Sequence, residues 1–268
     1  MEDKVIIITG ASSGIGKAFA YVFSDKGARV VLAARNKEKL EEIEQDLKAK
    51  NREILTVKTD VSVEADCKNL IDKTVRQFGR IDVLINNAGL SMRGLFEDLH
   101  PEVLEKVMNV NFWGTVYCTK YALAHLFKTK GSVVGISSIA GFQGLPGRTG
   151  YSSSKFAMHG FLESLRVETL RKGLHVMIAA PGFTSTDVRK SALGPDGKAQ
   201  GKSPRDESKM MSPERVAEIV ARGIKKRNRT IIMTTEGKLT VLLKKIAPTL
   251  LDQLTYKVMA KEPDSPFK

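Results

Sequence analysis

The sequence predicts an α/β fold: a doubly wound, seven-stranded parallel sheet with helices on both faces. Short β-branched runs alternate with longer amphipathic stretches along the chain. This alternation is typical of parallel sheets, because each helical stretch crosses back over the sheet and covers one of its faces. The 268 residues, of which 42% are hydrophobic, are enough for one sizeable core.

Each element has a local reason. Strands are expected in the short runs rich in valine and isoleucine, at residues 5–8, 29–33, 54–58, 81–85, 132–136, 175–179 and 230–233. Helices are expected from Gly14, over residues 37–50, 64–78 and 101–127, from residue 150 to Gly173, and from residue 213. Gly173 is a typical helix stop, and Ser212 followed by Pro213 is typical of a helix start.

The chain shows no internal repeat and no linker, so residues 1–268 are expected to form one domain. Residues 186–212 are rich in glycine, proline, serine and charge. Because a loop of this length in a compact domain is usually functional or disordered, we predict a mobile substrate lid there.

Residues 236–268 form an amphipathic tail, in which leucine and isoleucine recur at near-helical spacing and Pro248 interrupts the pattern. We expect a helical tail that packs on its own domain or on a partner subunit. The alternative, a basic amphipathic segment that contacts a membrane, is not favoured. No run approaches the ~18 apolar residues of a membrane span.

Composition limits the partners and the compartment. The net charge is +13, and lysine and arginine outnumber aspartate and glutamate by twelve to six between residues 187 and 229. No nucleic-acid-reading motif accompanies this excess, so we expect a solvated basic face and no nucleic-acid partner. The two cysteines lie far apart and the first residues lack the layout of a signal peptide, which favours a cytoplasmic location. The four histidines have no metal-ligand spacing, so no metal site is expected.

A glycine-rich turn follows the first predicted strand. Gly10, Gly14 and Gly16 fall between this strand and the next helix. Glycine permits a tight turn and lets the backbone approach a pyrophosphate, which the helix N-terminus then stabilises. In a seven-stranded α/β pattern, this turn predicts a Rossmann-type dinucleotide site at the carboxyl ends of the strands.

Residues after the next three strands are expected at the same edge of the sheet. Enzymes that use NAD commonly have an acidic residue after the second strand, whereas this chain has Arg35, with Lys37 nearby. A guanidinium suits a 2′-phosphate, so NADP is the predicted cofactor and NAD the alternative. Asp60 and Val61 are placed to hold the adenine, and residues 86–89 (Asn-Asn-Ala-Gly) supply amides and small side chains.

Tyr151 and Lys155 lie four residues apart, so they share one face of the predicted helix. A cation beside a phenol favours the phenolate and lowers the pKa of the tyrosine, which makes the pair a candidate for proton transfer. Ser138 lies upstream, after the fifth strand, where its hydroxyl is placed to hold a carbonyl oxygen against that phenol. These three residues predict carbonyl reduction or alcohol oxidation.

These motifs, in this order, resemble the single-domain, classical form of the short-chain dehydrogenase/reductase family. The resemblance covers residues 4–235. It is carried by the Thr-Gly-x3-Gly-x-Gly run from Thr9 to Gly16, Asp60, the Asn-Asn-Ala-Gly run, Asn111, Ser138, Tyr151, Lys155 and the Pro181-Gly182 pair.

The resemblance implies roles for individual residues. Tyr151 would be the general acid in reduction and the base in oxidation, and Lys155 would lower its pKa and bind the nicotinamide ribose. Ser138 would orient and polarise the substrate carbonyl, and Asn111 would bind a water that links Lys155 to solvent. The cofactor contacts would come from Gly10, Ser12, Ser13, Gly14, Ile15, Gly16, Arg35, Asp60, Val61, Asn87, Ala88, Gly89, Tyr151, Lys155, Pro181, Gly182, Thr184 and Thr186.

This chain departs from the family pattern at two positions. Thr184 stands where the family usually has an aliphatic residue. Ser13 stands where many members that prefer NADP have a basic residue, so Arg35 is left to select the 2′-phosphate.

The predicted function is NADP(H)-dependent transfer of a hydride between nicotinamide and a small-molecule substrate. This substrate is a ketone or a secondary alcohol, and a hydrophobic compound is one option. An epimerase or dehydratase on the same scaffold is one alternative, disfavoured by the short chain and by the complete Ser-Tyr-Lys-Asn set. A non-catalytic dinucleotide-binding sensor is the other, disfavoured by the intact Tyr-Lys pair. The resemblance also implies a homodimer or homotetramer.

Overall fold

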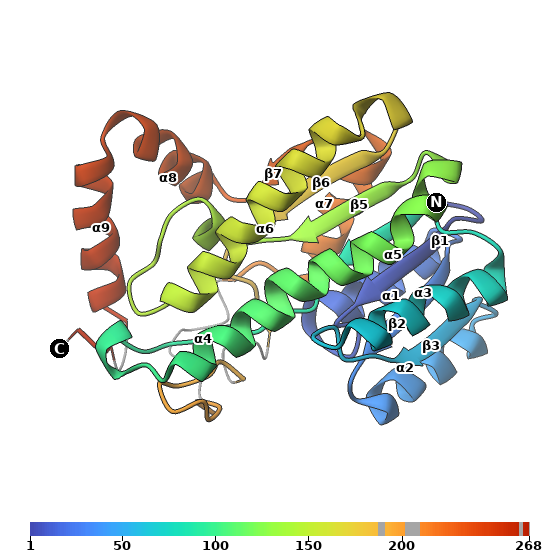
Figure 1. Ribbon diagram of the computed structural model, residues 1–268, viewed down its shortest axis with the longest axis horizontal. Coiled ribbons are helices and arrows are strands. Elements are labelled where there is room, and N and C mark those ends of the chain that lie inside the picture. The colour runs from blue at the N-terminus through green and yellow to red at the C-terminus, as the bar shows by residue number, and fades with distance from the viewer. Residues whose placement is uncertain (187–190, 202–209, 263–264, 268) are drawn as a thin grey trace.

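A computed structural model describes residues 1–186, 191–201, 210–262 and 265–267 of the chain. Within these residues, seven strands form one sheet in the order β3-β2-β1-β4-β5-β6-β7, and all neighbouring strands are parallel (Figure 1). The predicted doubly wound fold is therefore confirmed. The connections reverse direction between β1 and β4, which is the place where such sheets bind their ligands.

The strands are β1 (Val5–Thr9), β2 (Arg29–Ala34), β3 (Ile54–Lys58), β4 (Val83–Asn86), β5 (Ser132–Ile136), β6 (His175–Ala180) and β7 (Thr230–Ile232). The sequence predicts that the fourth strand begins at Ile81, but in the structure it begins at Val83. The Asp82 carboxylate accepts the backbone N–H of Val5 at 3.0 Å and two bonds from Arg80. Because a side chain takes the place of a backbone partner there, the regular ladder starts two residues later than predicted, at Val83.

The helices that cover the sheet are α1 (Gly14–Asp25), α2 (Lys37–Ala49), α3 (Glu64–Phe78), α4 (Pro101–Met108), α5 (Gly114–Thr129), α6 (Thr149–Glu168) and α7 (Pro213–Lys225). The long helix predicted over residues 101–127 is continuous, but a π-helical turn (Asn109–Trp113) joins α4 to α5. Ser212 caps α7 as predicted, since its hydroxyl accepts the backbone N–H of Arg215 at 3.1 Å.

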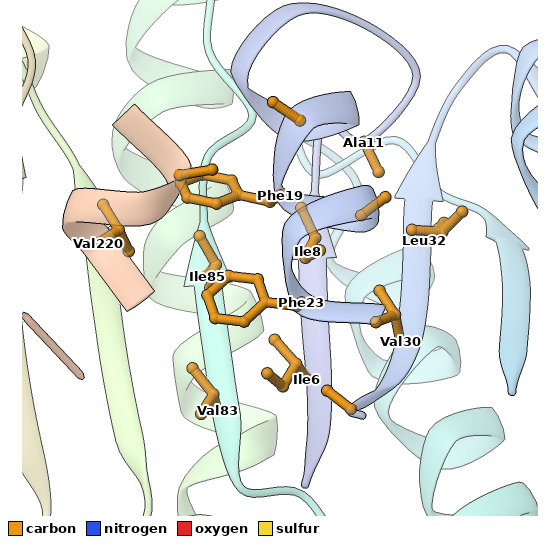
Figure 2. Close-up of a cluster of buried hydrophobic side chains, with 14 of the residues drawn as sticks. Ile6, Ile8, Ala11, Phe19, Phe23, Val30, Leu32, Val83, Ile85 and Val220 are labelled. Atoms are coloured by element: carbon orange, nitrogen blue, oxygen red, sulfur yellow. The ribbon is translucent and has the colours of Figure 1, made fainter. Parts of the chain in front are cut away.

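Both faces of the sheet are buried, which explains why its strands are continuous apolar runs. Helices α1, α2 and α7 cover one face, and α3, α5 and α6 cover the other. On the first face, Phe19 and Phe23 of α1 point onto Ile6, Ile8 and the neighbouring strands (Figure 2). Both rings are fully buried, and their centroids lie 5.8 Å apart.

The tail forms two helices, α8 (Thr235–Ile246) and α9 (Pro248–Ala260), which lie at one side of the sheet layer (Figure 1). The predicted helical character and the break at Pro248 are confirmed. Leu251 and Met259 are buried. Apolar side chains that stay exposed on these helices are Leu239, Leu242, Ile246, Leu250, Leu254 and Val258. No helix among the described residues is long and apolar enough to cross a membrane.

Part of the predicted lid lies against the loop after β4. Leu193 donates its N–H to Ser91 and accepts that of Arg93, at 2.9 and 2.8 Å, and His100 donates to Pro195 at 3.0 Å. Residues 187–190 and 202–209 of the predicted lid lie outside the described residues. The mobility of this segment stays a prediction.

The buried aromatic pair gives the first test. Phe23→Ala should lower the free energy of unfolding by about 3–5 kcal/mol, because it removes a fully buried ring from a close-packed core. Urea unfolding followed by circular dichroism measures this change. Phe96→Ala is the matched control: its ring is 68% exposed, so a change within about 0.5 kcal/mol is expected. Equal losses in the two variants would contradict the assigned core.

Candidate active site

The glycine-rich turn lies at the carboxyl end of β1, packed against the loop after β4. Gly10 has φ +66°, and a Cβ added to it would lie 2.8 Å from the Cα of Ala88. A Cβ on Gly16 would lie 2.0 Å from the carbonyl oxygen of Gly10. Only glycine fits at these two positions, because the chain passes too close to itself for any side chain.

Hydrogen bonds hold the ends of β1 and β4 together. The hydroxyl of Thr9 accepts the backbone N–H groups of Asn87 and Ala88, each at 3.0 Å. The side-chain amide of Asn87 donates back to the carbonyl of Thr9 at 2.9 Å. The turn and the Asn-Asn-Ala-Gly run therefore form one rigid unit at the point where the sheet connections reverse.

The N-terminus of α1 suits a phosphate. Ser13 occupies the N-cap position, its side chain is exposed and makes no capping bond, and the first turn holds no acidic residue. Backbone N–H groups that no capping side chain binds, together with the positive end of the helix dipole, favour binding of an anion. Thr186, after β6, lies over the turn: its Cγ2 would be 3.0 Å from a Cβ on Gly14.

Arg35 follows β2 directly and is exposed. Within the described part of the chain it has no recorded ion pair or hydrogen bond, whereas Lys37 pairs with Glu41 at 3.2 Å. After β3, the Asp60 carboxylate accepts the backbone N–H and the hydroxyl of Ser62, at 3.0 and 2.6 Å. The adjacent Val61 is buried. These residues line the same edge of the sheet as the glycine-rich turn.

The three predicted catalytic side chains meet at the carboxyl end of β5. The Ser138 side chain lies close enough to the Tyr151 hydroxyl to favour its ionised form and so to oppose the rise in its pKa. The Lys155 ammonium lies 5.7 Å from the centroid of the Tyr151 ring and donates to the carbonyl of Ile136 at 2.9 Å. Lys155 is only 4% exposed, so its charge is held close to the phenol in a nearly water-free position.

Burial dominates the acid–base state of this group. Burial raises the pKa of Tyr151 above its usual value, against the opposing hydrogen bond from Ser138 and the charge of Arg148. Burial lowers the pKa of Lys155 to about 8. The spacing of the pair alone predicts a lowered tyrosine pKa, whereas in the structure burial outweighs the interactions that lower this pKa. Tyr151 therefore keeps its proton at neutral pH, which is the state a general acid needs.

Asn111 is completely buried in the π-helical turn between α4 and α5. Its side-chain oxygen accepts the N–H of Leu90 at 2.7 Å, and its amide donates to the Leu90 carbonyl and to the Ser154 hydroxyl, both at 2.9 Å. Ser154 lies next to Lys155 on α6. Asn111 thus ties the loop after β4 to the helix that carries the tyrosine and the lysine.

The segment after β6 completes the edge of the site. Pro181 is buried and Gly182 half-buried, and the Thr184 hydroxyl donates to the Gly182 carbonyl at 3.1 Å. Sequence reasoning gave no role to four residues that contact the site: Thr9, Ile136, Ser154 and Arg148. The first three act through hydroxyl or carbonyl groups whose partners lie far away in the sequence, so local patterns carry no signal for them.

An apolar cluster packs beside Tyr151. It comprises Met92, Leu99, Val103, Val107 and Leu193, with Leu90 and Leu104 partly buried against it. A separate cavity of about 900 Å³ opens between residues 143–146, α6 and α9. Its α6 lining includes Ser152 and Phe156, which stand on a different face of the helix from Tyr151 and Lys155. We therefore do not place the reaction in this cavity.

The described residues include no group of three or more histidine, cysteine, aspartate or glutamate side chains that could hold a metal ion.

Comparison with known proteins gives consistent relatives. Residues 4–195 match the model of the short chain dehydrogenase family. The chain is 39% identical to an Arabidopsis thaliana protein called 11-beta-hydroxysteroid dehydrogenase-like 2, over 95% of this chain and 81% of that protein. It is 35% identical to Bos taurus dehydrogenase/reductase SDR family member 7B, over 98% of this chain and 83% of that protein.

Two solved structures are similar in fold. One is an alcohol dehydrogenase from Thermococcus sibiricus complexed with 5-hydroxy-NADP, with a TM-score of 0.77, 26% identity, and coverage of 87% of this chain and 96% of that one. The other is a short chain dehydrogenase/reductase from Burkholderia phymatum in complex with NAD, with a TM-score of 0.84, 24% identity, and coverage of 93% and 95%.

The close approach at Gly16 gives a test of the cofactor site. Gly16→Ala should weaken binding of a nicotinamide dinucleotide by about 10- to 100-fold, because overpacking of this kind costs about 1–3 kcal/mol. Isothermal titration calorimetry measures the affinity. Gly160→Ala is the control: a Cβ there meets nothing within 4 Å, so unchanged affinity is expected. Wild-type affinity in the Gly16 variant would disprove the assigned turn.

Proposed function

Because this chain belongs to the short-chain dehydrogenase family of nicotinamide-dependent oxidoreductases, we propose that it is an NADP(H)-dependent enzyme. It would transfer a hydride between nicotinamide and a hydrophobic ketone or secondary alcohol. One observation carries the proposal: Tyr151 and Ser138 lie together with a buried Lys155, whose Nζ would be 3.7 Å from a Cβ on Gly89 in the loop that packs on the glycine-rich turn.

The chain's own residues supply position and a proton. The Ser138 hydroxyl donates to the substrate carbonyl oxygen and polarises it, and Tyr151 gives its proton to that oxygen as negative charge develops there. Lys155 then stabilises the phenolate that remains, because a cation within a few ångströms favours the charged form. The bound cofactor supplies the hydride. In the direction of oxidation, the same phenolate accepts the proton of the alcohol.

We assign the cofactor contacts to the residues that line the carboxyl edge of the sheet. They are Gly10, Ser12, Ser13, Gly14, Ile15, Gly16, Arg35, Asp60, Val61, Asn87, Ala88, Gly89, Pro181, Gly182, Thr184 and Thr186, with Tyr151 and Lys155 at the nicotinamide ribose. The side chain of Asn111 is used by Leu90 and Ser154. We therefore propose that the backbone of the π turn holds the water that would link Lys155 to solvent.

Arg35 supports NADP over NAD. It is exposed at the end of β2, where a ribose 2′-phosphate would lie, and no described residue is recorded as pairing with it. Asn36 is the next residue, and it uses its side chain to cap α2 at 2.8 Å from the N–H of Lys39. The end of β2 therefore offers a permanent positive charge and no carboxylate to bind ribose hydroxyls.

The surroundings of Tyr151 support a hydrophobic substrate. The apolar cluster beside it joins the loop after β4, α4 and Leu193 of the predicted lid. The name of the Arabidopsis thaliana relative, which refers to an 11-beta-hydroxysteroid, is consistent with this substrate class. We also propose a homodimer or homotetramer and a reducing, cytoplasmic location, the latter supported by two buried cysteines without a disulfide.

Removal of the phenolic hydroxyl tests the chemistry. Tyr151→Phe should lower kcat by about 10²- to 10⁴-fold, the usual value of a general acid, and leave NADPH affinity nearly unchanged. Tyr121→Phe is the control, since its hydroxyl bonds Glu64 on α3, away from the site. NADPH oxidation with a panel of hydrophobic ketones measures the rates. Near-normal turnover of Tyr151→Phe would refute the mechanism. If the wild-type protein binds NADPH tightly but reduces none of the ketones, a non-catalytic sensor would be favoured.

Removal of the guanidinium tests the cofactor. Arg35→Ala should weaken NADPH binding by about 10- to 100-fold, because it removes one or two charge-assisted hydrogen bonds worth about 1.5–3 kcal/mol in all. NADH binding should not change. Lys37→Ala is the control, because that ammonium already pairs with Glu41. Equal effects of Arg35→Ala on NADPH and NADH, measured by fluorescence titration, would exclude 2′-phosphate recognition.

A further inference from the structure

Three side chains of α6 bind consecutive residues at the end of β5. Tyr151, Lys155 and His159 follow one another at a spacing of four, so they share a face of the helix. Tyr151 lies against the Ser138 side chain, which acts on its pKa, and Lys155 donates to the Ile136 carbonyl at 2.9 Å. His159 bonds the residue between them: its Nε2 lies 2.6 Å from the hydroxyl of Ser137.

The contact between His159 and Ser137 is buried and closely packed by neighbouring residues. Both side chains are buried, at 7% and 4% exposed. The ring of Phe142 meets the imidazole edge-on, with centroids 4.5 Å apart. A Cβ added to Gly141 would lie 2.7 Å from both the imidazole Nε2 and the Ser137 hydroxyl, so this neighbour has to be glycine. The surroundings therefore fix the imidazole in one place.

The histidine is neutral at physiological pH. Burial, followed by the charges of Lys155 and Arg166, lowers the pKa of His159 to about 4. A neutral imidazole shares one proton with the Ser137 hydroxyl, either as acceptor or as donor. It adds no second cation beside Lys155, so it holds the strand end without weakening the charge that the proposed mechanism uses.

Ser137 is the link between this contact and the chemistry. Its N–H donates to the Ala179 carbonyl at 2.7 Å, which continues the β5–β6 ladder, and its hydroxyl lies 3.4 Å from the Ser138 carbonyl. Ser138 follows directly and caps a short 3-10 turn, accepting the Ala140 N–H at 3.2 Å. A rotation of Ser137 would therefore turn the Ser138 hydroxyl away from Tyr151.

We infer that His159 is a positioning residue: through Ser137 it holds the strand end that aims the Ser138 hydroxyl at Tyr151 and at the substrate carbonyl. This inference deepens the proposed function and rests on it for its kinetic consequence. Its structural consequence, the placement of the Ser138 side chain against Tyr151, does not depend on turnover.

The kinetic test compares His159→Leu, His159→Gln and Ser137→Ala with the wild type. His159→Leu should lower kcat/KM for the carbonyl about 10-fold. This is the effect of losing one hydrogen bond, here the bond from Ser138 to the substrate carbonyl. NADPH affinity should stay unchanged. His159→Gln keeps a neutral hydrogen-bonding group at a similar reach and should restore most of the loss. Ser137→Ala, a smaller change that keeps the core packed, should reproduce the effect of His159→Leu.

The two substitutions should not add. If His159 acts through Ser137, the double variant His159→Leu/Ser137→Ala should be no slower than either single variant. Full additivity would overturn the inference, because the two residues would then act independently.

The chain supplies a matched control at the other end of the same strands. His175 on β6 is also buried, and its Nδ1 lies 3.0 Å from the hydroxyl of Ser132 on β5. Ser132 and His175 pair at the amino ends of these strands, away from the catalytic edge. His175→Leu should lower the melting temperature but leave kcat, KM and NADPH affinity at wild-type values.

A readout without turnover separates this inference from the proposed function. With ¹³C-labelled tyrosine, the Cζ resonance of Tyr151, assigned by its loss in Tyr151→Phe, reports the contact with the Ser138 side chain. His159→Leu should shift this resonance, and His175→Leu should not. If the resonance shifts in His159→Leu but the wild-type protein turns over no carbonyl, the inference would be supported and the proposed function refuted. An unshifted resonance with wild-type kinetics in His159→Leu would overturn the inference and leave the function intact.

Discussion

The site depends first on the bond between the ends of β1 and β4. The Thr9 hydroxyl accepts two backbone N–H groups from the loop after β4, and Asn87 returns a bond to the Thr9 carbonyl. These strands are neighbours whose connections leave in opposite directions, so a crevice opens there in any doubly wound sheet. The bonds fix its width, and the glycines of the turn allow the two backbones to come within contact distance.

Burial sets the acid–base state of the proposed catalytic group. Burial disfavours the charged form of Lys155, so the pKa of this ammonium falls to about 8. Burial also raises the pKa of Tyr151, so the phenol keeps its proton. Ionisation of the phenol becomes favourable only when charge develops next to it. In the proposed mechanism, such an arrangement would stabilise the state reached during the reaction more than the resting state, which is the condition for catalysis. Salt screens the Lys155 charge little, because this side chain is only 4% exposed.

The sequence predicted the architecture, which the structure confirms, and it predicted a candidate site at one edge of the sheet, since both predictions follow from patterns. A period of four places Tyr151 with Lys155, and a glycine-rich turn after a strand places the dinucleotide. Features that depend on the third dimension gave no such signal. The π turn around Asn111 changes the backbone pitch without a distinctive composition, and the late start of β4 depends on the Asp82 carboxylate. His159 was indistinguishable from an ordinary core histidine, because its partner is defined only by the packing of α6 on β5.

The C-terminal tail is bound to the domain at its far end. The Glu262 carboxylate, 4% exposed, pairs with Arg148 at 3.1 Å and with Arg93 at 3.5 Å. Arg148 directly precedes α6, and its charge acts on Tyr151. Loss of one partner from a buried ion pair costs about 3–5 kcal/mol, so detachment of the tail would be expensive and would change the electrostatics of the phenol. This pairing favours a tail packed on its own domain, and it leaves the apolar side chains of α8 and α9 on the outer surface.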